Sequence, residues 1–137
     1  MERTFKLEII TPYRIFFTGK AGMLVFTASD GELGILADHE PCVASVHIGA
    51  ARILIDGVWR VAAFSEGFLE MEGNRVTVLV GAAEWPEEID VARAERALSR
   101  ANERIRENLV PLITRRSEVA ARRAKTRLKI AALVQKE

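Results

Sequence analysis

A run of cationic side chains near the C-terminal end is the group in this sequence best suited to binding chemistry. Between Thr114 and Val134 the chain carries seven cationic side chains and one acid, Glu118. Guanidinium and ammonium groups pair with carboxylates, so this segment is suited to an acidic surface. A solvated helix face is the common alternative for such a run. The cations are Arg115, Arg116, Arg122, Arg123, Lys125, Arg127 and Lys129.

The sequence offers no recognisable catalytic or metal motif. It contains no Walker-type phosphate loop, no GxGxxG, no HExxH and no GxSxG. His39 and His47 lack a neighbouring Cys or His at ligand spacing, and Cys42 is the single cysteine. We therefore expect a binding or regulatory protein rather than an enzyme, with no metal ligand and no internal disulfide.

The charges divide the chain near Trp85-Pro86. Residues 1–86 carry 7 Lys/Arg and 11 Asp/Glu, a sum of −4, whereas residues 87–137 carry 13 and 8, a sum of +5. This change predicts two domains with different tasks, 1–86 and 87–137. The start of the chain has neither an apolar signal core nor the composition of a transit peptide, which predicts a protein that stays in a cytoplasm.

The acidic first part has the pattern of short strands. Phe5, Leu7 and Ile9 alternate with polar residues, and Asp56-Gly57 and Gly73-Asn74 each separate two β-prone runs, as in tight hairpins. Turn signals recur at intervals of roughly 8–12 residues without helices between them, which predicts an all-β sandwich or flattened barrel. We expect four aromatic residues in its core, namely Phe5, Phe26, Trp59 and Phe68.

The basic second part has helical spacing. Acidic residues follow Pro86, where the helix dipole favours negative charge, and Thr114 is the predicted N-cap of a second helix. Two helices joined by a short break predict an antiparallel hairpin. The apolar positions are Ala94, Leu98, Ala101 and Ile105 in the first helix, and Ala120, Ala124, Leu128 and Ala131 in the second.

The predicted seam between these helices is weak. Most of its residues are alanines, each of which buries about one methyl group, against roughly 1.5–3 kcal/mol for a buried Leu or Ile. Like charges three or four residues apart on the second helix also repel one another. The sequence therefore predicts a detachable hairpin whose second helix binds an acidic surface.

The segment from Gly31 to Pro41, GELGILADHEP, resembles the GELGIL-x-x-H-x-P motif of the epsilon subunit of the F-type ATP synthase. Two further matches follow in order, GFLEM with NRVTVL at residues 67–71 and 74–79, and Ala83-Glu84 with IDVARA at 89–94. The resemblance covers the whole chain. It implies a ten-stranded β-sandwich followed by a helical hairpin, in a non-catalytic subunit.

The family resemblance also implies partners and a location. The sandwich would bind the gamma subunit of the rotor and the polar loops of the c-ring, and the extended helices would reach the catalytic alpha and beta subunits and inhibit ATP hydrolysis. The membrane would be met only indirectly, through the c-ring, on the cytoplasmic side of a bacterial plasma membrane. No nucleic-acid partner is expected, because the first part is acidic and lacks a basic and aromatic platform.

The resemblance implies three groups of binding residues. Glu32 and His39 match positions that contact the c-ring, where a carboxylate and an imidazole can grip a polar loop; a turn with solvated side chains is the alternative. A regulatory ATP site, without a required cofactor, would use Glu84, Asp90, Arg93, Arg123 and Arg127; the alternative is an acid at the start of the helix, an ion pair between Asp90 and Arg93 and a solvated basic face. Docking on the catalytic head would use Arg115, Arg116 and Arg122.

Two hypotheses from other classes remain open at this stage. A free-standing ATP-sensing protein would close its hairpin on the nucleotide and would form no stable complex with gamma. A nucleic-acid binder would use the basic second helix, and its binding would depend strongly on salt.

Overall fold

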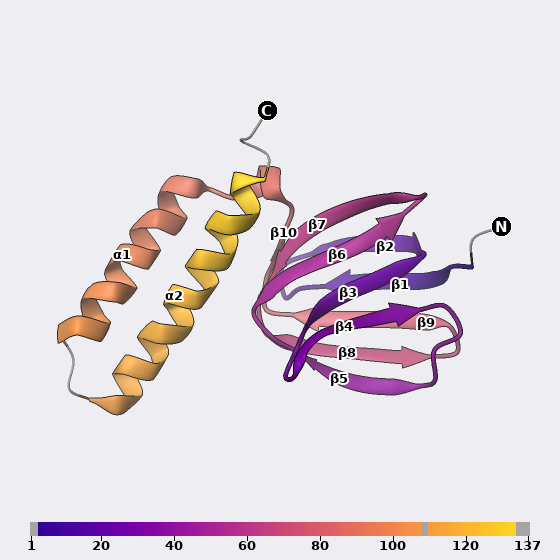
Figure 1. Cartoon of the computed structure of the whole chain (residues 1–137), viewed down its shortest axis with the longest axis horizontal. Helices are drawn as coiled ribbons and strands as arrows, with labels where there is room; N and C mark the ends of the chain where they lie inside the picture. The colour runs from indigo at the N-terminus through magenta and orange to yellow at the C-terminus, as the bar shows by residue number, and fades with distance from the viewer. Residues whose placement is uncertain (1–2, 108–109, 134–137) are drawn as a thin grey trace. The chain divides into compact units, whose positions relative to one another are not determined.

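The computed structural model describes residues 3–107 and 110–133 (Figure 1). The chain divides into two compact units, Met1–Glu84 and Trp85–Glu137. The boundary between them therefore falls two residues before the one expected from the change in charge.

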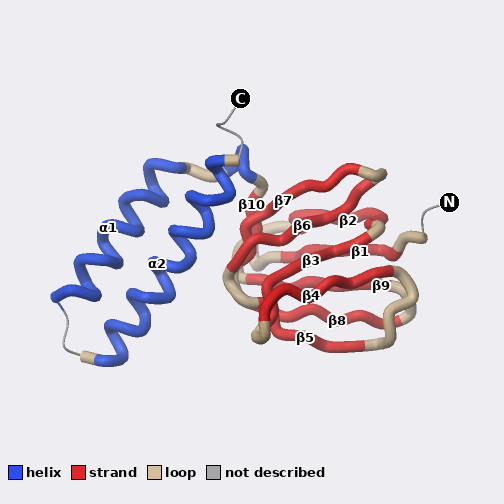
Figure 2. Tube along the Cα trace, viewed as in Figure 1, coloured by secondary structure: helices blue, strands red, loops and turns tan. Residues whose placement is uncertain are grey.

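The first unit is a β-sandwich of two five-stranded sheets, as the sequence predicted (Figure 2). One sheet has the strand order β2-β1-β9-β8-β5 and the other β10-β7-β6-β3-β4. Strands β1 and β9 pair in parallel, and all other neighbouring pairs are antiparallel. The strands are β1 (Phe5–Ile10), β2 (Ile15–Ala21), β3 (Met23–Ala28), β4 (Gly31–Leu36), β5 (Cys42–Val46), β6 (Gly49–Ile55), β7 (Val58–Phe64), β8 (Gly67–Glu72), β9 (Arg75–Val80) and β10 (Ala83–Glu84).

The predicted hairpin turns are confirmed. Asp56 and Gly57 join β6 to β7 with φ of 49° and 78°, and Gly73 and Asn74 join β8 to β9 with φ of 56° and 60°. Positive φ at both central residues is the property of the tight turn that matches the twist of paired strands. These turns fix the register, which directs one side of each strand into the core. Side chains with no exposed area include Leu7, Ile9, Leu24, Ile35, Ile53, Leu69, Val76 and Val78.

Two of the four aromatic residues expected in the core lie on the surface instead. Phe5 and Phe26 are buried, but Phe68 is 62% exposed and Trp59 is 46% exposed. Phe68 lies next to Leu69, which points inward, so alternation along β8 turns Phe68 outward. An aromatic side chain such as that of Phe68 is usually buried, but the register of β8 turns it toward solvent.

The second unit is an antiparallel helical hairpin, which confirms the predicted architecture (Figure 1). A short 3₁₀ helix, η1 (Pro86–Glu88), precedes α1 (Val91–Glu107) and α2 (Pro111–Ala132). The prediction that Thr114 caps the second helix was wrong, because the N-cap of α2 is Val110, four residues earlier, and Pro111 is the first residue of the helix. Proline is well suited to a first helical position, since its φ is preset and its missing N–H is not needed there.

The seam of the hairpin consists mainly of small residues. The buried side chains of α1 are Ala94 and Ala101, and Ile130 is the one large apolar side chain buried in the described part of either helix. Leu98 and Leu128, which the spacing placed in the seam, are half-buried. The other buried residues of α2 are Ser117, Ala121, Ala124 and Ala131. No helix in residues 3–107 and 110–133 is long and apolar enough to cross a membrane.

Candidate functional site

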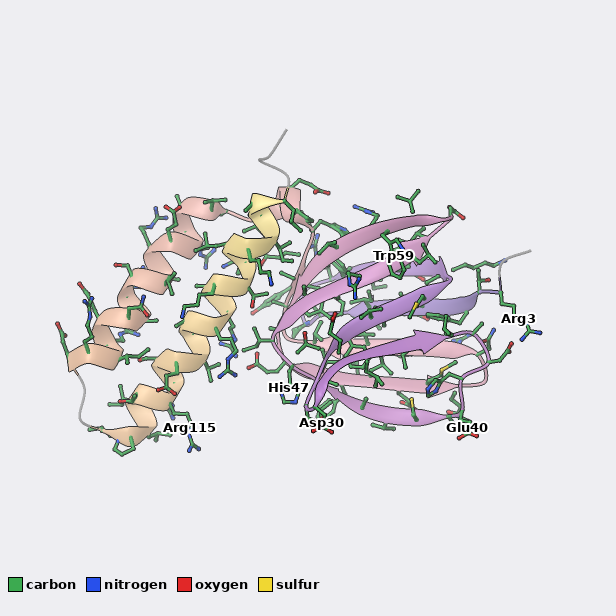
Figure 3. The ribbon with its side chains drawn as sticks, viewed as in Figure 1. Arg3, Asp30, Glu40, His47, Trp59 and Arg115 are labelled. Carbon is green, nitrogen blue, oxygen red and sulfur yellow. The ribbon has the colours of Figure 1, made fainter. Side chains whose placement is uncertain are left out.

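The three arginines expected to dock on the catalytic head lie on two different faces of α2. Arg115 and Arg122 are exposed and seven residues apart, so they share one face two turns apart. Figure 3 shows the Arg115 side chain pointing away from the helix near the start of α2. Arg116 instead lines a groove between α1 and α2. Arg115 and Arg122, which share the face of α2 that we call the outward face, therefore remain the candidates for docking on the catalytic head.

Four of the five residues expected to bind ATP belong to the hairpin. Asp90 and Arg93 lie at the start of α1, and Arg123 and Arg127 are one turn apart on α2. The helices run antiparallel, and the groove joins residues 97–104 to 113–120. The start of α1 therefore lies level with the part of α2 that holds Arg123 and Arg127. Glu84 belongs to β10 in the other unit.

Asp90 has a structural role that sequence reasoning had raised only as an alternative. Its Oδ1 atom accepts a hydrogen bond from the backbone N of Arg93 over 3.0 Å, and its carbonyl accepts one from Ala94. This is the geometry of a helix N-cap, which satisfies amide groups that the first turn leaves without intrahelical partners. The carboxylate of Asp90 thus stabilises α1 whether or not a nucleotide binds.

Glu32 lies near the start of β4 in a small charged and aromatic cluster. Its Oε2 accepts a hydrogen bond from Arg52 over 3.2 Å, and both side chains are about half exposed. The Arg52 guanidinium also lies 5.9 Å from the ring centre of Trp59, within range for a cation–π contact. An ion pair this exposed adds little stability, so Glu32 can exchange Arg52 for another partner at small cost.

His39 lies in the exposed loop after β4, and its Nδ1 is 2.8 Å from the carbonyl oxygen of Glu40. The preceding residue, Asp38, has φ of 63°, a conformation that favours glycine. Asn74 supports this loop by accepting from the Asp38 backbone N and donating to the Thr4 carbonyl, both over 2.9 Å. The loop that presents His39 is thereby tied to the turn between β8 and β9.

Glu32 and His39 are not neighbours in space. Glu32 is the second residue of β4, and His39 follows the turn after the other end of that strand. The four extended residue steps from Glu32 to Leu36 rise roughly 13 Å. Figure 3 shows the same separation, with Asp30 at one end of the sandwich and Glu40 at the other. The two residues therefore lie toward opposite ends of β4.

An apolar row crosses the outer face of the β10-β7-β6-β3-β4 sheet and was missed by sequence reasoning. Leu36 pairs with Met23, Met23 with Leu54, and Leu54 with Trp59. Leu36 is 54% exposed, and a Cβ added at Gly34 would lie 2.8 Å from the Met23 Cε, so the glycine leaves room for Met23. Outer faces of antiparallel sheets are usually polar, and exposed apolar patches mark interaction surfaces.

A second apolar row crosses the other sheet. Phe68 pairs with Leu79, Leu79 with Ile10, and Ile10 with Ile15. Phe68 and Ile15 are each 62% exposed, and Leu79 is 50% exposed. Repeated apolar residues at outward positions of paired strands are a signal that could have found both rows, once the register was known.

The fold and these surfaces define a two-domain binding protein in which protein contacts, rather than an active site, carry the function. The chain belongs to the ATP synthase delta/epsilon chain family. Residues 4–86 match the family's beta-sandwich domain and residues 87–132 match its long alpha-helix domain. Membership of this family bears out the expectation of a non-catalytic subunit.

Curated relatives match most of the chain. The ATP synthase epsilon chain of Ruminiclostridium cellulolyticum is 46% identical over 91% of this chain and 93% of its own length. The epsilon chain of Caldanaerobacter subterraneus is 43% identical over 98% and 99%. Among solved structures, a chain of the Euglena gracilis mitochondrial ATP synthase has a TM-score of 0.79 at 22% identity, covering 95% of this chain and 81% of that chain. The last likeness establishes the fold alone.

Proposed function

We propose that this chain is a central-stalk subunit of a proton-translocating F-type ATP synthase, whose sandwich joins gamma to the c-ring. The family match supports the complex, and the two apolar rows on the sandwich supply surfaces that a partner would cover. The location that follows is the cytoplasmic face of a bacterial plasma membrane, reached through the c-ring. The observation that carries the proposal is a match over both domains with relatives that are named epsilon chains.

The gamma subunit binds the row formed by Leu36, Met23, Leu54 and Trp59. This sheet also carries Glu32, and His39 follows its edge strand, so gamma and c-ring contacts would form one continuous surface. Trp59→Glu should weaken capture of a matched gamma subunit by about a hundredfold, since buried aromatic anchors dominate interface energies. Phe68→Glu, the control on the opposite row, should leave capture unchanged. The reverse result would move the gamma site to the other sheet.

Glu32 and His39 contact separate polar loops of the c-ring. Because Glu32 and His39 lie toward opposite ends of β4, we expect their contributions to add. We expect Glu32→Ala and His39→Ala each to weaken assembly with the c-ring, and the double variant to show the sum of the two free-energy changes. A double variant no worse than either single one would place both residues in one contact.

The hairpin inhibits ATP hydrolysis when its outward face meets the catalytic subunits. The test is hydrolysis by a bacterial catalytic core containing gamma, with the full chain or with residues 1–86 added. Inhibition by the full chain alone supports the proposal. Replacing both Arg115 and Arg122 by Gln should weaken inhibition, whereas the same change at Arg96 and Arg106, two exposed arginines of α1, should not. If neither form of the chain binds a matched gamma subunit, the central-stalk assignment fails.

Regulatory ATP would bind between the start of α1 and the facing part of α2. Guanidinium groups one turn apart at Arg123 and Arg127 can both reach a triphosphate. Arg123→Ala should weaken ATP binding by roughly 1–3 kcal/mol, the scale of a charge-assisted hydrogen bond. Lys129→Ala is the control, since it removes one charge from the same helix. An unchanged ATP titration for Arg123→Ala would exclude this residue from the site.

A further inference from the structure

A groove between α1 and α2 is lined by basic side chains that have no role in the proposed function. It has a volume of about 400 Å³ and lies toward the end of the hairpin where α1 stops and α2 starts. Arg100 and Arg104 line it from α1, and Arg116 and Ser117 line it from α2, over a floor that is mostly alanine. A volume of this size is within the usual range for small-ligand sites.

The groove collects positive charge from both helices. None of its lining residues is an acid. Among the described residues, no hydrogen bond or ion pair is formed by the side chains of Arg100, Arg104 or Arg116. A cation in the last turn of a helix is favourable, which explains Arg104 and Arg106. It does not explain Arg100, one turn earlier on the same face, or Arg116 on the opposite helix.

The rest of the groove also favours an anion. Ser117 is 5% exposed and lines the groove, so its hydroxyl offers a donor near the three guanidiniums. The groove also reaches Ile113 in the first turn of α2, where the helix dipole is positive. Arg100, Arg104 and Arg116 are exposed, and guanidinium groups that line one groove can donate forked hydrogen bonds to the oxygens of a phosphoryl group.

We propose that this groove binds a small anion bearing phosphoryl groups, such as inorganic phosphate or diphosphate, and that the anion bridges α1 to α2. A ligand that binds the closed hairpin and not the open one stabilises the closed form by mass action. The site is separate from the expected ATP site, since Arg116 and Arg123, the nearest members of the two sites on α2, are seven residues, roughly 10 Å, apart along the helix. The anion would contact residues of the hairpin alone. Its effect on the inhibition of ATP hydrolysis rests on the proposed function.

Calorimetric titration of the full chain with diphosphate, at about 150 mM NaCl to screen weak surface attraction, tests this site. The wild-type chain should bind one diphosphate. The Arg104→Gln/Arg116→Gln variant should bind at least about tenfold more weakly. The matched control, Arg106→Gln/Arg115→Gln, removes the same charge from the same two helices and should change affinity less than about twofold. Circular dichroism would verify that both variants keep their helices.

Three results would overturn the proposal. Equal weakening in the two double variants would mean general attraction to a basic surface. No weakening in either would place the anion elsewhere. Loss of binding in Arg123→Gln/Arg127→Gln alone would mean that the expected ATP site takes the diphosphate. If the anion raises the melting temperature of the helices but the chain does not inhibit hydrolysis, the groove stands and the proposed function fails separately.

Discussion

The sandwich and the hairpin are held together by different kinds of side chain. The sandwich buries large branched residues with no exposed area, such as Leu7, Ile53 and Leu69. The hairpin buries mainly alanines, with Ile130 as the one large apolar side chain buried in the described helices. Since hydrophobic stabilisation scales with the apolar area removed from water, each seam contact contributes less than a core contact.

This difference suits one rigid platform and one arm that can open. Paired strands with fixed turns hold the sandwich surfaces in place, which the proposed central-stalk role requires. A helix pair with few large contacts and many like charges on α2 has a small free energy of closure, so partners and ligands can shift its position. The proposed regulation would therefore act through the unit that buries the least apolar area.

The largest expected effect is in the sandwich. Ile53→Ala removes a fully buried side chain from β6 and should lower the free energy of unfolding of the sandwich by about 2–5 kcal/mol. Urea unfolding followed by Trp59 emission, in a Trp85→Phe background, measures this. Ala124→Gly in the seam should leave that transition unchanged. A shift of the Trp59 transition by the seam variant would show that the two units unfold together.

A glycine in β8 provides the second prediction. A Cβ at Gly67 would lie 1.8 Å from the carbonyl oxygen of Leu79, so Gly67→Ala forces the backbones of β8 and β9 apart. We expect a loss of about 1–3 kcal/mol in the same unfolding experiment. Gly22→Ala is the control, because its Cβ would meet the Leu54 side chain at 3.3 Å and backbone only at 3.9 Å, an ordinary contact distance. Equal losses for both would contradict the close backbone contact.

The third prediction concerns the hairpin alone. Asp90→Ala removes the N-cap of α1 and should lower the stability of the hairpin by about 1 kcal/mol, without changing that of the sandwich. Thermal melting followed by circular dichroism at the helical band measures the effect. Glu95→Ala, an exposed acid on the same helix, is the control and should have a much smaller effect.

The smallest expected effect is the response to salt. Raising the NaCl concentration screens the repulsion between cations on α2, so the helical transition should move to higher temperature by an amount worth a few tenths of a kcal/mol. The sandwich transition should change less, because its net charge is smaller and its stability comes from apolar burial. A salt response equal in the two units would contradict this.

The architecture could be predicted because its signals are local. Alternation at Phe5, Leu7 and Ile9 and the turns at Asp56-Gly57 and Gly73-Asn74 determine strands without knowledge of the whole fold. The start of α2 was missed because Thr114 resembled an N-cap, whereas the structure uses Pro111. Two acceptable start signals lie three residues apart, and the sequence does not rank them.

The candidate surfaces were harder to predict because they depend on register and on distance. Trp59 and Phe68 are of residue types that are usually buried in cores. Only their pairing with Leu54 and Leu79 reveals that they belong to apolar rows on the outer faces of the sheets. The separation of Glu32 from His39 likewise follows from the extended course of β4. The groove at Arg116 requires both helices to be placed, and no spacing within one helix indicates it.

The most direct test of the difference between the two units is amide hydrogen exchange of the full chain, resolved by segment. The account predicts that amides of α1 and α2 exchange through local opening at least a hundredfold faster than those of β1, β8 and β9, since the free energies of opening differ by about 3 kcal/mol or more. Similar protection in the helices and the central strands would contradict the account, because the hairpin would then be as tightly held as the sandwich.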